Sequence, residues 1–411
     1  MSELKVEAAP EELGFDADRL RRIDRHFDRY LDDGRLTSWG AVVTRDGQIA
    51  HATVHGQRDR EAGLPADWET RWRIFSMTKP VTSVAAMMLH EEGAFALTDP
   101  ISRWLPEFAQ PRVYSKGSSA APLTVPAIEP IRVWHLLSHT AGLTYGFHHA
   151  HPVDAMYREA GFEWGSPAGL DLAGCVAAYA ELPLLFQPGA EWNYSVATDV
   201  LGRFVEVVSG STLDEFFRTR IFEPLGMTDT GFWVEGAAAE QLAALYVAAP
   251  GSKKAVRNDA FGAIGRSKPA SLSGGGGLVS TAGDYHRFTQ FLLRRGELDG
   301  VRLLSPRTVN LMTSNHLPGG ADLAEFGRPL FAESPFDGFG FGLGCSVLQD
   351  PVKAKSLGSI GEYAWGGAAS TAFWVNPAER VTALFFTQLL PSSTHPIRTE
   401  LGQLVYQALV G

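Results

Sequence analysis

The feature that most constrains the fold is the position of β-type segments at both ends of the chain, with helical patterns between them. Near the N-terminus, two runs of β-branched and apolar residues flank Asp46-Gly47, a dipeptide that favours a tight hairpin turn. Near the C-terminus, apolar runs flank Asn376-Pro377, which marks another turn between strands. Because strands need partners in a sheet, this pattern predicts one antiparallel sheet built from both ends of the chain.

Helical periodicity dominates the middle of the chain, from Ser76 to about residue 270, in stretches such as VTSVAAMMLHEEG and TDVLGRFVEVVSG. A first helix is predicted over Asp16–Asp33, where apolar residues recur on one face and Asp16 is placed to cap the N-terminus. Residues 109–130 and 145–170 are rich in Pro, Gly, Ser or His and are expected to be long loops.

The expected fold class is therefore α/β of the α+β type, with an antiparallel sheet flanked by helices and an inserted, mostly helical domain. Residues 1–75 and 271–411 are expected to form the sheet domain. Residues 76–270 are expected to form the helical domain, with an active site at the junction.

Charge and cysteine content exclude several classes of protein. The net charge of −10 argues against a nucleic-acid partner, which usually requires a basic face. The two cysteines, Cys175 and Cys345, form no disulfide framework and no metal-binding spacing. The sequence shows no signal peptide and no apolar stretch of membrane-spanning length, so a cytoplasmic protein without a membrane partner is expected. No cofactor is predicted, and the oligomeric state stays open.

A Ser-x-x-Lys motif supplies the first candidate chemistry. Ser76 and Lys79 follow the apolar run WRIF and open a helix, so their side chains share one face. A serine hydroxyl becomes a good nucleophile only when a neighbouring group accepts its proton, and a buried lysine can assist. The same spacing recurs at Ser2 and Lys5, so the motif by itself does not identify an active site.

Four further segments follow this motif along the chain. They are HLLSHTAGL at His135–Leu143, WNYSVATDVLG at Trp192–Gly202, GGGGLVSTAGDYHRF at Gly274–Phe288 and WGG at Trp365–Gly367. In this order, and with the Ser-x-x-Lys motif, they resemble the serine β-lactamase and penicillin-binding-protein superfamily. Within it they are most similar to the class C-related family VIII carboxylesterases. The resemblance spans roughly residues 15–410 and implies a β-lactamase-like fold.

The resemblance implies roles for individual residues. Ser76 matches the nucleophile and Lys79 the family lysine, while Tyr194 matches the tyrosine that shares general base and acid work with that lysine. A phenol ionises near neutral pH only beside a cation, and Lys79 would supply one. The backbone N–H groups of Ser76 and Ala368 are the implied oxyanion hole.

Trp365, Gly366 and Gly367 align with the family's Lys-Thr-Gly segment and are the expected substrate-binding residues. Two positions depart from the β-lactamase pattern. Val196 stands where the tyrosine motif has an asparagine, and Trp365 replaces the lysine. Valine offers no hydrogen bond and tryptophan no full positive charge, so both favour a less polar ester over an anionic lactam.

The sequence therefore predicts a serine carboxylesterase that hydrolyses short-chain acyl esters, with a small-molecule ester as its partner. An acyltransferase, a D-amino-acid peptidase or a β-lactamase on the same scaffold are the alternatives. A non-catalytic ligand-binding homologue is a more remote alternative, which the intact set of Ser76, Lys79 and Tyr194 disfavours.

Two groups of histidines are candidates for metal ligands. His148, His149 and His151 cluster in one loop, and His135 and His139 are spaced as neighbours on a helix, but neither group has a convincing set of metal ligands, so no metal is predicted.

Several aromatic residues in loop-like segments are candidates for lining an apolar acyl pocket. They are Phe147, Phe162, Trp164, Phe336 and Phe339.

Overall fold

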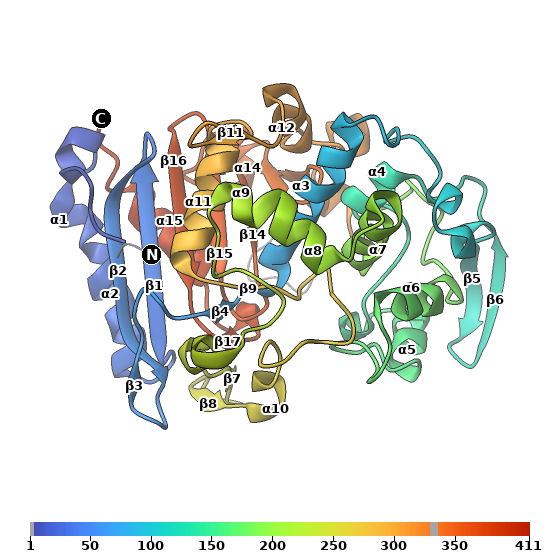
Figure 1. The fold of residues 1–411 in the computed structure, drawn as a ribbon, viewed down its shortest axis with the longest axis horizontal. Helices are drawn as coiled ribbons and strands as arrows, with labels where there is room; N and C mark the ends of the chain where they lie inside the picture. Colours follow the sequence, from blue (N-terminus) through green and yellow to red (C-terminus); the bar gives the residue numbers. More distant parts are fainter. Residues whose placement is uncertain (1–3, 329–335) are drawn as a thin grey trace.

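The left part of the molecule in Figure 1 is built on an eight-stranded sheet in which every neighbouring pair of strands is antiparallel. The computed structural model describes residues 4–328 and 336–411, so Ser2 of the second Ser-x-x-Lys match lies outside the described residues. In spatial order the strands are β12 (Phe339–Phe341), β13 (Ser346–Leu348), β14 (Tyr363–Gly366), β15 (Ala372–Asn376), β16 (Val381–Phe386), β1 (Ser38–Arg45), β2 (Gln48–Asp59) and β3 (Leu64–Pro65). The prediction of one antiparallel sheet from both chain ends is confirmed.

The local turn signals account for the order of these strands. Asp46 and Gly47 connect β1 to β2 with φ angles of 56° and 82°, the left-handed conformation that a two-residue hairpin turn requires. β1 then pairs with β16 from the other end of the chain, with Val42 opposite Leu384. Asn376 ends β15 just before the turn to β16, as the sequence predicted.

Helices cover both faces of the sheet, and each face has its own apolar core. α1 (Ala17–Leu20), α2 (Arg22–Asp32) and α15 (Ile397–Tyr406) pack on one face, where Trp39 and Phe385 are buried among them. The expected N-terminal helix is thus present as two segments, and the Asp16 side chain accepts a hydrogen bond from the Arg19 backbone N–H at its start.

The opposite face of the sheet is covered by α11 (Ala282–Leu293), which lies in front of the strands in Figure 1. On this helix the buried Gln290 amide donates to the hydroxyls of Thr44 and Thr382, at 3.1 and 3.0 Å. The apolar core of this face continues into the helical part of the chain, so that part is anchored directly to the sheet.

The helical part surrounds one nearly fully buried helix, α3 (Thr78–Glu91), in which every side chain from Thr78 to Leu89 is buried. A helix buried on all sides belongs in the middle of a domain rather than on its surface. The other helices of this part are α4 (Val133–Leu137), α5 (Pro152–Glu159), α6 (Leu172–Ala180), α7 (Ala197–Ser209), α8 (Leu213–Phe217) and α9 (Glu223–Leu225).

Two loop predictions for this part were wrong. Residues 109–130 contain a hairpin of β5 (Arg112–Ser118) and β6 (Ala121–Pro126), and residues 145–170 contain α5. Some of the residues that suggested a loop lie within the strands, since Ser115 falls at the irregularity between Tyr114 and Lys116 and Pro122 pairs with Gly117 next to the turn. A proline at the first position of α5 is likewise compatible with helix formation.

Short elements complete the fold. They are β4 (Trp72–Arg73) with β9 (Val279–Ser280), β7 (Tyr246–Ala248) with β8 (Ala255–Arg257) and β17 (Leu389–Leu390), β10 (Glu297–Leu298) with β11 (Val301–Arg302), and the helices α10 (Asp259–Gly262), α12 (Pro306–Met312), α13 (Leu323–Phe326) and α14 (Pro351–Ala354). The division into domains at residues 75/76 and 270/271 stays a prediction.

Across residues 4–328 and 336–411, no helix is both long and apolar enough to cross a bilayer.

A buried carboxyl group ties α15 to the sheet. Glu362, just before β14, accepts hydrogen bonds from the Tyr406 hydroxyl and, at 3.2 Å, from the Asn376 amide. Burial raises the pKa of Glu362 to about 7, and these two hydrogen bonds offset part of that rise. The protonated carboxyl is therefore much better tolerated here than the carboxylate.

Candidate active site

Ser76 lies in a single turn of 3-10 helix, Phe75–Met77, that leads directly into α3. The residue before it, Phe75, has a φ of 42°, a left-handed conformation that is unusual for an aromatic residue. Such strain is commonly held at functional sites. The N-terminus of α3 also places a partial positive charge beside the serine, where an oxyanion would form.

Lys79 is almost completely buried, with 1% of its surface exposed. Its ammonium group donates to three oxygens: Ser76 Oγ at 3.2 Å, the Tyr145 hydroxyl at 3.1 Å and the Gly275 carbonyl at 2.8 Å. Three acceptors match the three N–H bonds of the ammonium group, which is the condition for burying this charge. The spacing of Ser76 and Lys79 therefore produces direct contact.

The structure also brings Tyr194 to the serine. Its hydroxyl lies 2.6 Å from Ser76 Oγ, and Lys79 Nζ lies 4.4 Å from the centre of its ring. Tyr194 sits just before α7, and its backbone carbonyl accepts a hydrogen bond of 2.7 Å from His148 Nε2. The tyrosine ring packs against Trp365 at 5.4 Å between centroids, so contacts on several sides fix its orientation.

Tyr145 is a member of the site that sequence reasoning missed. Burial, and secondarily the negative charge of Asp199, raise the pKa of its phenol well above the usual value, so this hydroxyl stays protonated. It can accept a hydrogen bond from Lys79 without acting as the base. The available sequence signal was a tyrosine two residues after the His135–Leu143 segment.

Gly275, in the four-glycine run, brings its carbonyl to Lys79 because it has no side chain. A Cβ at this position would lie 2.7 Å from Asp199 Oδ2 and 3.1 Å from the Tyr145 hydroxyl. Asp199 in turn accepts hydrogen bonds from the Gly275 N–H at 3.0 Å and from Ser273 Oγ at 2.5 Å. The glycine run thus serves close packing beside the site, in agreement with the sequence interpretation.

The Trp-Gly-Gly segment runs along the site at the end of β14. A Cβ on Gly367 would lie 2.4 Å from the carbonyl oxygen of Ile74, so only glycine allows this strand to approach the turn that carries Ser76. The following residue, Ala368, packs in the same small apolar cluster as Phe75. Ala368 and Ser76 both line the same cavity. The oxyanion hole formed by their backbone N–H groups stays a prediction.

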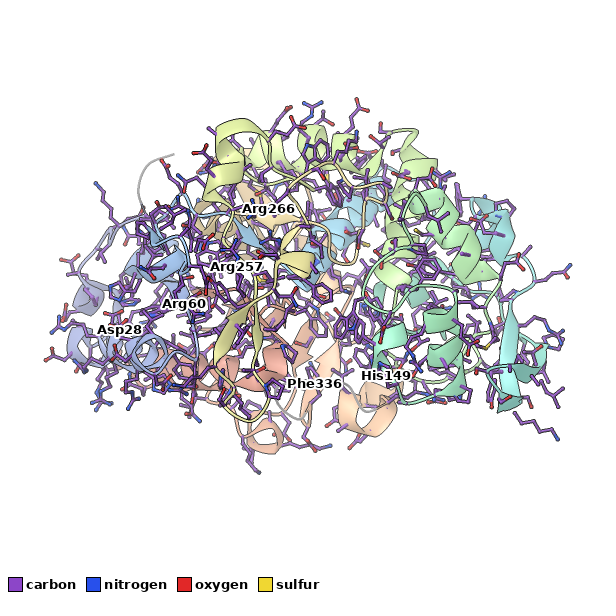
Figure 2. The ribbon with its side chains drawn as sticks, turned by 90° about the horizontal axis from the view of Figure 1, so that it is seen from below. Asp28, Arg60, His149, Arg257, Arg266 and Phe336 are labelled. Atoms are coloured by element: carbon purple, nitrogen blue, oxygen red, sulfur yellow. The ribbon has the colours of Figure 1, made fainter. Side chains whose placement is uncertain are left out.

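Ser76 and Tyr194 open into a cavity of about 1260 Å³, which also contacts Val196, Trp365 and Ala368. Drug-sized ligands usually occupy pockets of roughly 300–1,000 Å³, so this space exceeds what a short ester fills. Figure 2 labels Phe336, one of the aromatic residues of the cavity wall, and His149, which follows Phe147 and His148 in the loop on the helical side. All five aromatic candidates from the sequence line the cavity: Phe147, Phe162, Trp164, Phe336 and Phe339.

His135 and His139, the two histidines spaced as neighbours on a helix, make hydrogen bonds within the fold. His135 Nδ1 accepts a hydrogen bond from the Arg132 backbone N–H at 3.0 Å, and burial lowers the pKa of His135 to about 4. His139 is fully buried, with Nδ1 3.2 Å from Ser195 Oγ, and burial together with the Lys79 charge holds its pKa well below the usual range. Within the described part of the chain, no three His, Cys, Asp or Glu side chains gather as a metal site.

A serine and a buried lysine one helical turn apart, faced by a tyrosine beside an antiparallel sheet, form the arrangement typical of serine β-lactamase-fold hydrolases. The family model described as beta-lactamase matches residues 23–407. The chain therefore belongs to the beta-lactamase family, and the resemblance proposed from its motifs is confirmed.

Similar proteins agree with this assignment. Protein Rv1367c of Mycobacterium tuberculosis is 38% identical over 364 residues, covering 88% of each chain. Esterase EstB of Burkholderia gladioli is 31% identical over 418 residues, covering 97% of this chain and 98% of its own. Among solved structures, EstCE1, a hydrolase with promiscuous acyltransferase activity, is 28% identical with a TM-score of 0.80, covering 98% of this chain and 99% of its own. These likenesses support a hydrolase.

Proposed function

We propose that the protein is a serine carboxylesterase of the family VIII type that hydrolyses short-chain acyl esters. The observation that carries this proposal is the 2.6 Å contact between the Tyr194 hydroxyl and Ser76 Oγ, beside the buried ammonium group of Lys79. The esterase names among its relatives, EstB and a lovastatin esterase of Penicillium rubens that is 30% identical, support the same activity.

In the proposed reaction, the phenolate oxygen of Tyr194, stabilised by the ammonium group of Lys79, accepts the proton of Ser76 as the serine Oγ attacks the ester carbonyl. The tetrahedral oxyanion is held by the backbone N–H groups of Ser76 and Ala368. The proton then passes from Tyr194 or Lys79 to the departing alcohol, which leaves an acyl group on Ser76. Water, activated by the same pair, releases the acid and restores the serine.

Turnover of p-nitrophenyl acetate and butyrate tests this proposal. Wild type should hydrolyse both esters, and Ser76→Ala should reduce the rate to the background of the buffer. Ser83→Ala is the matched control, because it removes a buried hydroxyl of the same helix that has no hydrogen-bond partner among the described residues, so it should leave the rate unchanged. Undiminished activity of Ser76→Ala would refute the assignment.

An acyltransferase is a second candidate, favoured by the cavity volume of about 1260 Å³, which leaves room for an acceptor beside a bound acyl group. Adding alcohols during turnover and measuring transesterification products separates the two activities. Val196 and Trp365 favour both over a β-lactamase, so nitrocefin turnover at esterase-like rates would contradict this reading of the two residues. The small ester as partner, the absence of nucleic-acid and membrane partners, and a cytoplasmic location remain predictions.

A further inference from the structure

Three aromatic side chains form a continuous stack that begins at the catalytic lysine. The Tyr145 hydroxyl contacts Lys79 Nζ at 3.1 Å, and its ring is stacked on Phe147, with 4.7 Å between centroids and 19° between planes. Phe147 is in turn stacked on Trp164, at 4.9 Å and 14°. We call Tyr145, Phe147 and Trp164 the aromatic ladder.

The ladder runs along the cavity wall from the buried centre of the site to the surface. All three rings line the cavity, and the outermost, Trp164, is 50% exposed. Phe147 lies between the other two rings, so its faces are occupied and mainly ring edges remain to meet a ligand. Ring edges carry the positive part of the aromatic quadrupole and favour the face of another aromatic ring.

A second aromatic surface contributes to the same cavity from the sheet side. Phe336 is stacked on Trp365, at 6.2 Å and 20°, and Trp365 also packs against Tyr194. The acyl group and alcohol of a short aliphatic ester would fill little of this space and would use neither surface. The cavity therefore has room, beside a short acyl or alcohol group, for a second group of the ester that presents aromatic faces.

We propose that the aromatic ladder is a specificity subsite for a flat aromatic group, of naphthalene size or similar, in the ester substrate. This inference rests on the proposed esterase function, and it deepens it by naming the substrate class. The aromatic group belongs to either the alcohol or the acyl half of the ester, since both halves lie next to Ser76 during attack.

Binding to Ser76→Ala tests the subsite without requiring turnover. The probes are two matched pairs: 2-(2-naphthyl)ethyl acetate against its decahydronaphthyl analogue, and methyl 3-(2-naphthyl)propanoate against its decahydronaphthyl analogue. The saturated probes are at least as hydrophobic, so burial of apolar surface alone gives the naphthyl probes no advantage. Edge-to-face contacts with the aromatic rings do favour the naphthyl probes. In one pair or in both, the naphthyl probe should therefore bind about three- to tenfold more tightly than its saturated analogue.

Trp164→Ala, added to Ser76→Ala, should weaken this preference because it removes the outer ring of the ladder, whereas Trp68→Ala should retain it in full. Trp68 is a half-buried tryptophan that does not line the cavity and so serves as the matched control. The pair that shows the preference identifies which half of the ester carries the ring. Equal or weaker binding of both naphthyl probes, or a preference that Trp164→Ala leaves unchanged, would overturn the proposal. Turnover of p-nitrophenyl butyrate by wild type reports separately on the esterase function.

Discussion

The hydroxyl of Tyr145 offers the sharpest test of how the site holds its lysine. Tyr145→Phe keeps the aromatic ring and its stacking on Phe147 but removes one of the three acceptors of the Lys79 ammonium group. The remaining acceptors, Ser76 Oγ and the Gly275 carbonyl, satisfy two of the three N–H bonds. With 1% of Lys79 exposed, water has little access to the third.

The expected decrease in kcat follows from the loss of one of the three hydrogen-bond acceptors of Lys79. Leaving a buried, charged donor without its hydrogen bond costs about 1.5–3 kcal/mol, which makes the ammonium form of Lys79 less favourable. The proposed reaction needs that positive charge to stabilise the Tyr194 phenolate while the serine proton moves. If the whole cost falls on the chemical step, kcat should decrease about 10- to 150-fold, with a smaller change in KM.

Steady-state kinetics with p-nitrophenyl butyrate, recorded across pH for wild type and Tyr145→Phe, measure this effect. Tyr157→Phe is the matched control, because Tyr157 is a buried tyrosine of α5 whose hydroxyl makes no contact with Lys79. It should keep kcat near the wild-type value. A Tyr145→Phe enzyme with kcat within twofold of wild type would refute the role assigned to this hydroxyl.

Two further predictions concern buried groups. Since burial raises the pKa of Glu362 from 4.5 to about 7, this residue should cost the folded state up to about 3 kcal/mol as pH rises through that range. Urea unfolding at pH 4.5 and 7.5 should show that Glu362→Gln loses less stability than wild type, and equal losses would contradict this. Gly275→Ala should lower thermal stability by about 1–3 kcal/mol and reduce kcat, because its Cβ would meet Asp199. Gly402→Ala, with open space around the new methyl group, should do neither.

The sequence predicted those parts of the fold and site that depend on local patterns. The hairpin at Asp46-Gly47 follows from the φ angles that these two residues tolerate, and the contact of Ser76 with Lys79 follows from helical spacing. Tyr194 was found only through its resemblance to a family motif, since no local rule connects positions that lie so far apart in the chain.

Tyr145 and the aromatic ladder could not be predicted because they depend on the path of a long segment. The sequence suggested Phe147 and Trp164 as pocket-lining residues, but the position of Phe147 between Tyr145 and Trp164 is set by how residues 145–170 fold back on the site. The β5–β6 hairpin was missed for a related reason, because its prolines and serines outweighed its short alternating runs in the sequence pattern.

The central claim is that Ser76 forms a covalent acyl-enzyme, and intact-protein mass spectrometry tests it most directly. Wild type quenched in acid during turnover of p-nitrophenyl butyrate should carry one butyryl group, located by peptide mapping to Ser76. Ser76→Ala should carry none, whereas Lys79→Met should accumulate adduct slowly or not at all. An adduct on another residue, or the same adduct in Ser76→Ala, would contradict the account.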